Sequence, residues 1–273
     1  MKYISILVFS IILFSSCEKT SNIEIPNQDP ELVVAGFIGP NEDTLRLKLT
    51  WTVPIYNHTV SDNYEEANVK DAEVSFLSGG NTVKLQYSDN CNCYITANNS
   101  FKVGDEVNLS IKYNDHAELS SKTIIPKDPE FDIKFLGINT IDYGDYSDSY
   151  AQFKFTCLSN DPINYYRIKL LSYSHQGTFV QINEMYMYEN EYMKMEPNTS
   201  ITLNPYFNGY NTLDSVRYYI INCSEDYYKY HTSVKNYQGD DFFVEPSIIF
   251  DNIENGLGNF SAYNMVSDTL ITN

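Results

Sequence analysis

The sequence predicts an all-β protein with two tandem immunoglobulin-like or fibronectin-like β-sandwich domains and one short helix packed on the second. Apolar and polar residues alternate with a period of two along most of the chain, which is the pattern of half-buried strands. Residues 44–51, for example, place Leu45, Leu47 and Leu49 on one face. Turn signals such as Gly79-Gly80 separate these segments, and many short strands at this spacing are typical of a β-sandwich.

The first set of strands ends at a connection that contains two prolines. Alternating segments are expected at 31–38, 44–51, 72–77, 81–87, 106–113 and 117–124. The polar stretch 124–130 then carries Pro126 and Pro129, and such stretches commonly separate domains. We therefore expect an N-terminal sandwich over residues 31–126 and a C-terminal sandwich over residues 127–273.

The second set of strands is interrupted once by a helical pattern. Strands are expected at 130–135, 149–157, 164–174, 178–188, 199–204, 215–223, 246–253 and 258–264. Between them, residues 225–238 repeat tyrosine and apolar positions at helical spacing. Ser224 is the expected N-cap, Glu225 and Asp226 occupy the first turn, and Gly239 is the expected C-cap. This stretch predicts one amphipathic helix that covers part of the second sandwich.

Residues 1–16 have the features of a lipoprotein signal peptide. Lys2 precedes an apolar run at 4–14, about half the roughly 20 residues that a membrane-spanning helix needs. Two serines then precede Cys17, as in the bacterial lipobox, where the cysteine is acylated and becomes the new N-terminus. The alternative is an ordinary signal peptide with an incidental cysteine. Residues 17–30 are polar and contain two prolines, so we expect a lipidated tether there.

The chain is strongly acidic, with a formal net charge of −18 at pH 7. This charge disfavours binding to phosphate backbones or to an anionic membrane face, so no nucleic-acid partner is expected. Two interpretations remain: the charge keeps the protein soluble, or it attracts a cationic ligand or divalent ions.

Four cysteines follow Cys17. Cys157 and Cys223 each end an alternating strand, and they would form a disulfide if the two strand ends lie together; the alternative is two separately buried thiols. Cys91 and Cys93 are spaced too tightly for a relaxed structural bridge and have no further cysteine or histidine pair nearby for a zinc site.

The usual catalytic motifs are missing from the sequence. There is no His-Glu-x-x-His, no Gly-x-Ser-x-Gly and no phosphate-binding glycine loop. The four histidines are scattered along the chain: His58, His116, His175 and His231. We therefore expect a protein that is not an enzyme and binds no cofactor. Hydrolysis by a pair of its 36 acidic residues is the catalytic alternative.

One loop offers a weak candidate for a metal site. Asp142, Asp145 and Asp148 lie close together in the sequence, and calcium favours clusters of oxygen ligands. Their spacing differs from that of an EF-hand loop, so a solvated loop is the alternative interpretation.

Tyrosine is unusually frequent, with 24 among 273 residues. Residues 185–188 alternate methionine and tyrosine, so one strand face must be core and the other can be exposed; Tyr192, Met193 and Met195 are expected in the connection beyond. Tyrosine supplies a large, rigid contact area with a polar tip, which suits ligand or partner recognition. The candidate ligand- or partner-binding residues are Tyr186, Tyr188, Tyr192, Met193 and Tyr228.

The order of several short segments along the chain is distinctive. After the lipobox cysteine come IEIP, LVVAGFI, VKDAEVSF and FKVGDEVNLSI, and near the end YYKYHTSV and FFVEPSIIFDNIENGLGNFSAYN. This order resembles the Bacteroidota lipoproteins grouped as domain of unknown function 4249, over nearly the whole mature chain. Residues 245–263 carry the most specific part of the resemblance. Asn259, where an apolar residue is more usual, and the Cys91 and Cys93 pair depart from it.

The resemblance implies an outer-membrane lipoprotein that works beside a TonB-dependent receptor. We therefore expect a non-catalytic binding accessory in nutrient uptake, with a small nutrient, a peptide or a glycan as its ligand and a lipid anchor as its only membrane contact. A structural or adhesive cell-envelope protein is the alternative, and a carboxylate-dependent hydrolase is the third. Glu18 is the one acidic residue directly after the cysteine, and the cell surface is favoured over the periplasmic face.

Three tripeptides resemble the Asp-Ser/Thr-apolar acceptor of envelope O-glycosylation in this phylum. Their acceptor residues would be Thr44, Ser215 and Thr269. Short patterns of this kind also arise by chance, and two of the three begin predicted strands.

Overall fold

The computed structural model describes residues 29–53, 67–144, 147–176, 179–187, 190–207, 212–237 and 248–272. The chain divides into two compact units, residues 1–30 and 31–273. The predicted signal peptide, Cys17 and nearly all of the tether lie outside the described residues. Among the residues that are described, no helix is both long enough and apolar enough to cross a bilayer.

The second unit is built mostly from strands, which confirms the predicted all-β class. The strands are β1 (Leu32–Ile38), β2 (Leu45–Trp51), β3 (Glu73–Ser78), β4 (Asn81–Ser88), β5 (Cys93–Thr96), β6 (Glu106–Lys112), β7 (Leu119–Ile124), β8 (Phe131–Asp142), β9 (Ser147–Cys157), β10 (Asn164–Gln176), β11 (Phe179–Glu184), β12 (Tyr192–Met195), β13 (Ser200–Leu203), β14 (Tyr206–Phe207), β15 (Thr212–Cys223) and β16 (Leu257–Ile271). In one continuous sheet the order is β11-β10-β15-β16-β1-β2-β5-β4-β3-β6-β7, and β12 also pairs with β10. A second sheet contains β8, β9, β13 and β14.

The N-terminal half is a sandwich whose two layers are joined by β4. Up to Leu85 this strand pairs with β3, and from Gln86 onward it pairs with β5. The strands β1, β2 and β5 therefore face β3, β6 and β7 across one hydrophobic core. Alternate residues of each strand enter this core, as in β2, where Leu45, Leu47 and Leu49 are buried and their neighbours are not.

The C-terminal half is a second sandwich with its own core. The layer of β10, β15 and the end of β16 faces the sheet of β8, β9, β13 and β14. In β10, Tyr166, Ile168 and Leu170 are fully buried in this core, so the residues between them lie on the opposite face of the strand.

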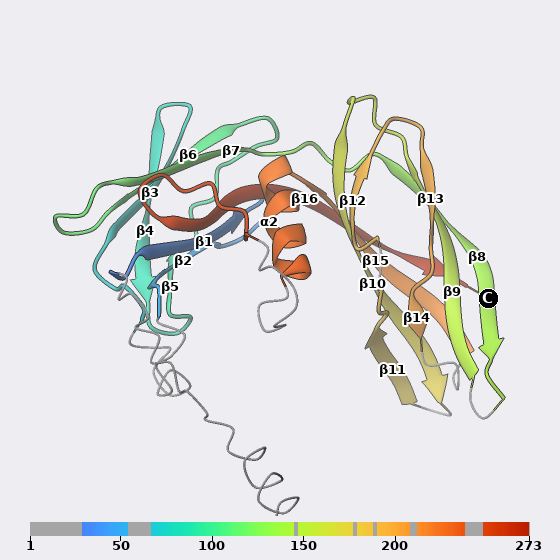
Figure 1. The fold of residues 1–273 in the computed structure, drawn as a ribbon. Helices are drawn as coiled ribbons and strands as arrows, with labels where there is room; N and C mark the ends of the chain where they lie inside the picture. Colours follow the sequence, from blue (N-terminus) through green and yellow to red (C-terminus); the bar gives the residue numbers. More distant parts are fainter. Residues whose placement is uncertain are drawn as a thin grey trace, which may run out of the picture. The chain divides into compact units, whose positions relative to one another are not determined.

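The last strand belongs to both halves. Leu257–Ala262 of β16 pair in parallel with β1, and its remaining residues pair in antiparallel with β15. Figure 1 shows β16 running from the N-terminal half to the C-terminal half. The segments before and after the expected boundary at 126/127 contribute mainly to different cores, but Ile253, Phe260 and Ala262 from the end of the chain belong to the core of the N-terminal half.

Gly258 is what permits β16 to approach β1. Its φ is +107°, and a Cβ at this position would lie 2.0 Å from Val34 O. The segment before β16 is not the strand expected at 246–253, because the described residues 248–253 are irregular. There the side chain of Asn252 takes the place of a strand partner: its Oδ1 accepts from Phe260 N at 2.9 Å and its Nδ2 donates to Phe260 O at 2.9 Å.

The helix α2 (Glu225–Asn236) follows β15 directly. The Ser224 hydroxyl caps its N-terminus by accepting from Tyr227 N, as predicted. The helix ends earlier than expected, because Tyr237 is the C-cap and has an extended backbone; Gly239 lies outside the described residues. The helix packs against β16, β10 and β12, and Figure 1 shows it beside β16.

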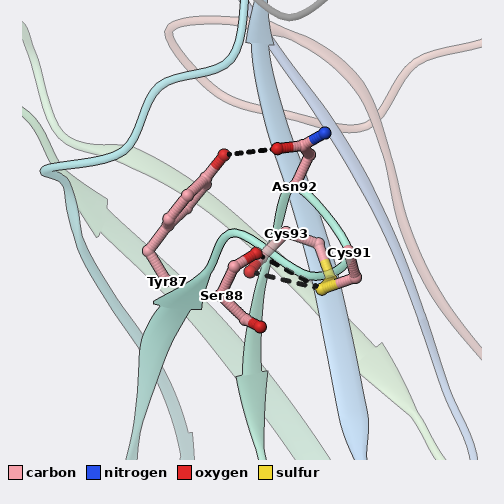
Figure 2. The surroundings of a disulfide bond; sticks show 5 residues. All are labelled: Tyr87, Ser88, Cys91, Asn92 and Cys93. Carbon is pink, nitrogen blue, oxygen red and sulfur yellow. Dashed lines mark hydrogen bonds between the residues drawn. A yellow bond between two sulfur atoms is a disulfide. The ribbon is translucent and has the colours of Figure 1, made fainter.

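The cysteines differ from the sequence-based expectation. Cys91 and Cys93 form a disulfide across the turn between β4 and β5, with their Cα atoms 5.2 Å apart (Figure 2). The prediction that this spacing is too tight was wrong, because Asn92 adopts a positive φ of 48° that turns the chain between them. Figure 2 also shows Cys91 Sγ near Ser88 O (3.7 Å); a disulfide sulfur carries no hydrogen, so we describe this as a sulfur–oxygen contact.

Of the two possibilities for Cys157 and Cys223, the structure has the second: no bridge joins them, and both are buried free thiols. Cys157 belongs to the core of the C-terminal half, where its Sγ lies 3.6 Å from Tyr166 Oη. Cys223 instead faces α2, and its Sγ donates to Tyr165 O at 3.3 Å. The two thiols therefore lie on opposite faces of the β10–β15 layer and cannot meet.

Candidate functional site

The structure separates the residues predicted to form the recognition surface. Met185 and Met193 are buried in the core of the C-terminal half, so Met193 is a packing residue rather than a contact for a ligand. Tyr186, by contrast, is 67% exposed and lies on the other face of its segment. The alternation of methionine and tyrosine is therefore confirmed as a core face and an outer face. Tyr188 lies outside the described residues.

Tyr192 and Tyr228 lie next to α2 and not beside Tyr186. Tyr228 contacts Tyr165 of β10, with ring centroids 5.1 Å apart. Tyr192 stacks on His231 of the helix at 5.5 Å. Both tyrosines are partly buried in a small cluster between the helix and the sheet, so they help to hold α2 in place.

Arg167 is the charged centre of this region. It lies on the outer face of β10, because its neighbours Tyr166 and Ile168 enter the core. Its Nε donates to Glu191 Oε1 at 3.0 Å, its Nη1 donates to Tyr227 Oη at 3.1 Å, and its guanidinium lies 5.0 Å from the centre of the Tyr192 ring. The Arg167 side chain is only 22% exposed, and such a charge needs partners of this kind when it is buried.

Aromatic rings surround this ion pair. We use the name aromatic cluster for Phe37, Tyr192, Tyr227, Tyr230, His231 and Tyr263. The His231 ring is 4.2 Å from that of Tyr227 and 5.0 Å from that of Phe37. Burial, with a smaller effect of the charge on Arg167, lowers the pKa of His231 to about 4. Its Nε2 is buried and has no hydrogen-bond partner among the described residues, so the imidazole is neutral at ordinary pH.

A cleft of about 460 Å³ lies where the two halves meet. We use the name junction cleft for this hollow. It is lined by Glu106, Lys122, Thr123, Ile124, Pro126, Lys127, Asp161, Ile163, Asn164, Tyr165, Asn222, Cys223, Ser224, Glu225 and Asp226. A second hollow of about 450 Å³ continues along β7 and shares Lys122 and Asp226 with the first. Together they form a groove between β7 on one side and the start of α2 on the other.

The charges in the junction cleft are mainly negative. Lys127 is held between Glu130 (3.0 Å) and Asp161 (3.1 Å), so its charge is already compensated. A hydrogen bond from Lys229, together with one from Tyr165, lowers the pKa of Glu225 and keeps that carboxylate ionised. Ile124 and Ile163 are 56% and 46% exposed at the cleft, so the walls combine acidic groups with apolar side chains.

The other predicted sites lie apart from the cleft. Asp142 Oδ1 accepts from Gly144 N at 2.8 Å, which is a turn contact within its own loop; Asp148 lies in β9, and Asp145 is outside the described residues. No group of three or more potential ligand residues that could hold a metal is found in the part of the chain that the structure describes. Of the acceptor residues, Thr44 is half-buried before β2, Ser215 is half-buried in β15, and Thr269 is exposed in β16.

Sequence reasoning missed the junction cleft because its lining comes from separate segments. One residue comes from β6, and the others come from β7, the connection after it, the residues before and at the start of β10, the end of β15 and the start of α2. The proline-containing connection, predicted as a domain boundary, was the available signal, because clefts often form where domains meet.

Comparison with curated proteins finds no match. Among solved structures, a two fibronectin type-III domain segment from chicken tenascin matches with 14% identity and a TM-score of 0.21; the match covers 90% of this chain and all of that one. The family described as "Domain of unknown function (DUF4249)" matches residues 18–269. The match spans most of the chain, and the protein therefore belongs to this family.

Proposed function

We propose that this protein is a lipid-anchored outer-membrane lipoprotein that acts as a non-catalytic binding accessory of a TonB-dependent receptor in nutrient uptake. The observation that carries the proposal is the junction cleft, a groove with acidic and apolar walls at the meeting point of two sandwiches. Clefts between domains are frequent binding sites because several segments can present side chains to one ligand.

The groups in the cleft suit binding better than bond cleavage. Two of its carboxylates are engaged in local contacts: Glu225 pairs with Lys229 at 3.0 Å, and Asp226 Oδ2 accepts from Asn252 at 2.9 Å. Such contacts hold a negative surface in position. A ligand or partner with positive and apolar groups would match this surface.

The location rests on the sequence around Cys17. The family match begins at residue 18, directly after that cysteine, which fits a leader that is removed before the conserved part of the protein. Acylation at Cys17 would anchor the protein, because each buried CH₂ of a lipid chain contributes about 0.8 kcal/mol. The test is metabolic labelling with a fatty-acid analogue: wild type is expected to carry the label, and a Cys17→Ala variant is expected to lose it.

Co-purification tests the partner. Outer membranes are solubilised in a mild detergent, the tagged full-length protein is captured, and its companions are identified by mass spectrometry. A TonB-dependent receptor is expected in amounts comparable to the bait. An unrelated tagged lipoprotein of the same membrane serves as the control. Recovery of the protein alone, or equal recovery of the receptor with the control, contradicts the proposal.

Protease treatment of intact cells tests the side of the membrane. Exposure at the cell surface predicts degradation, while a periplasmic protein is kept as the protection control. Complete protection would place the protein on the periplasmic face and leave the accessory role to be judged by co-purification.

A structural or adhesive envelope protein is the second candidate, and the joined halves favour it. β16 extends through both sandwiches, and such a shared strand would suit a spacer that resists bending. Deletion separates the two candidates: an uptake accessory predicts poorer growth on particular nutrients, whereas a spacer predicts altered adhesion or envelope integrity on all of them.

A further inference from the structure

The outer edge of β7 is open beside the junction cleft. At its start, Ser120 exchanges two backbone hydrogen bonds with Glu254: Glu254 N donates to Ser120 O at 2.8 Å, and Ser120 N donates to Glu254 O at 3.3 Å. Every second residue of a strand directs its backbone groups to the same side, so Lys122 and Ile124 present theirs outward as well. Ile125 confirms the alternation, because its N–H turns inward to Asp105 O at 3.0 Å.

Within the described ranges, the outward N–H and C=O groups of Lys122 and Ile124 have no backbone partner. These residues also line the junction cleft, and Lys122 is shared with the neighbouring hollow. Thr123 between them is only 6% exposed, and its Oγ1 has no hydrogen-bond partner in the part of the chain that the structure describes. This hydroxyl is buried, so an added strand would bond the outward backbone groups of Lys122 and Ile124 and would not reach it.

The edge strand β8 of the other sheet is built differently. It carries an irregularity between Phe135 and Gly137, and an ion pair between Asp132 and Lys134 at 3.1 Å. Bulges and charges on an edge strand discourage pairing with another chain. The segment from Ser120 to Ile124 has no register shift and carries a single charge, at Lys122.

The surroundings of the β7 edge select for positive and apolar side chains. The acidic residues that line the two hollows are Glu106, Asp161, Glu225, Asp226 and Glu254. Asp161 already pairs with Lys127 (3.1 Å) and Glu225 with Lys229 (3.0 Å). Glu106, Asp226 and Glu254 are therefore the acidic groups here that make no ion pair with any described residue. The exposed side chains of Ile124 and Ile163 supply apolar contacts at the same place.

We propose that the β7 edge accepts an extended segment of a partner protein as an added strand, and that lysine or arginine alternates with apolar residues in this segment. The main-chain bonds would come from Lys122 and Ile124, and the alternating side chains would meet the acidic and apolar walls. This is recognition by strand addition, in which backbone bonds give affinity and pockets for alternate side chains give specificity. The inference deepens the proposed function, and it rests on that proposal only for the identity of the partner.

Peptide binding to the purified full-length protein in detergent tests the inference directly. The probe is a fluorescein-labelled hexapeptide in which lysine alternates with valine. Its fluorescence anisotropy is measured at protein concentrations up to about 1 mM, so that weak binding is also detected. Two controls isolate the two parts of the proposal: the same peptide with glutamate in place of lysine, and the lysine peptide N-methylated at alternate residues. Both are expected to bind at least tenfold more weakly. Failure of the lysine peptide to bind, or equal binding of either control, overturns the inference.

The variant Ile124→Pro tests the backbone contact. It removes an N–H that points outward and leaves the β6–β7 bonds in place, because proline is tolerated where the N–H of an edge strand faces away from the sheet. Ile124→Ala is the matched control for the lost side chain. Binding of the lysine peptide is expected to fall about tenfold further with proline than with alanine, which corresponds to one hydrogen bond. Equal affinities of the two variants contradict strand addition.

Hydrogen exchange on the wild type keeps the test independent of how the proline variant folds. The lysine peptide is expected to slow exchange of the amides of Lys122 and Ile124, and unchanged exchange at saturating peptide overturns the inference.

Co-purification separates this proposal from the proposed function. A receptor retained equally by wild type and Ile124→Pro leaves the accessory role standing and removes the β7 edge as its docking site. Peptide binding without any co-purified receptor supports the β7 edge as a site for an added strand and contradicts the receptor as its partner.

Discussion

Asn222 and Asn264 are direct register partners across β15 and β16, and both donate to the connection between the two halves. Asn222 Nδ2 donates to Lys127 O at 3.0 Å, while Asn264 Nδ2 donates to Pro126 O at 3.1 Å and to Asp128 Oδ1 at 2.8 Å. The connection has no strand partner of its own, so its carbonyls need such donors. These two buried amides therefore hold the connection that lines the junction cleft at Pro126 and Lys127.

Replacing Asn264 by alanine is expected to lower the free energy of unfolding by roughly 1–3 kcal/mol, because a buried amide is removed and the partly buried Pro126 carbonyl loses its donor. Asn222→Ala is expected at the lower end of that range, since its amide makes one such bond. Urea denaturation measures both. The control is Asn183→Ala, whose side chain is exposed on β11 and whose effect is expected to stay within about 0.5 kcal/mol. An Asn264→Ala variant as stable as this control would show that the connection does not depend on the amide.

Thiol labelling tests the arrangement of the cysteines. The native protein is expected to react with no alkylating reagent, because Cys157 and Cys223 are buried and burial raises the pKa of the Cys223 thiol. Denaturation without a reductant is expected to expose two reactive thiols, and denaturation with a reductant four. Intact-mass spectrometry counts the labels, with acylated Cys17 unreactive in each case. Labelling of four thiols without a reductant would exclude the Cys91–Cys93 disulfide, and labelling of none would indicate a second bridge.

Local patterns predicted the strands well, and long-range pairing could not be predicted. The alternation in β2 and β10 follows from burial of one face, so it is visible in the sequence. The parallel pairing of β16 with β1 joins residues from the two ends of the fold, and no local pattern in the sequence indicates it. The disulfide was missed because a general rule on spacing does not anticipate the positive φ of Asn92.

The candidate site was predicted only in part for a similar reason. Tyrosine content indicates contact area, but it does not tell an exposed ring such as Tyr186 from one held under a helix such as Tyr192. Whether a tyrosine ring is exposed or covered depends on where α2 packs. The cleft residues follow no period at all, because each segment contributes only one or a few side chains.

Tyr192 and Tyr186 are expected to respond differently to truncation. Tyr192→Ala removes the ring that lies against both Arg167 and His231, so it is expected to cost about 2 kcal/mol or more of stability. Tyr186→Ala removes a ring that is 67% exposed, and its cost is expected to be below about 1 kcal/mol. Denaturant unfolding of both variants measures the two losses of stability. Equal small losses would place Tyr192 on the surface, as the sequence suggested, and would return it to the list of contact residues.

His231 is expected to make the protein less stable as the pH falls. Its pKa in the folded protein is about 4, because burial and the charge of Arg167 disfavour the protonated ring, whereas the ordinary value is 6.5. Between these two values the unfolded chain binds a proton that the native protein does not, so stability present above pH 6.5 is lost on acidification toward pH 4.

His231→Phe keeps an aromatic ring in the cluster and removes the titration, so urea midpoints measured at pH 7 and pH 5 should differ less than in wild type. His116→Gln changes an exposed histidine and is expected to retain the wild-type difference. The carboxylate of Glu225, whose lowered pKa also ties stability to pH, is present in all three proteins and cancels in the comparison. A wild-type loss of stability that persists unchanged in His231→Phe would assign the acid sensitivity to other groups.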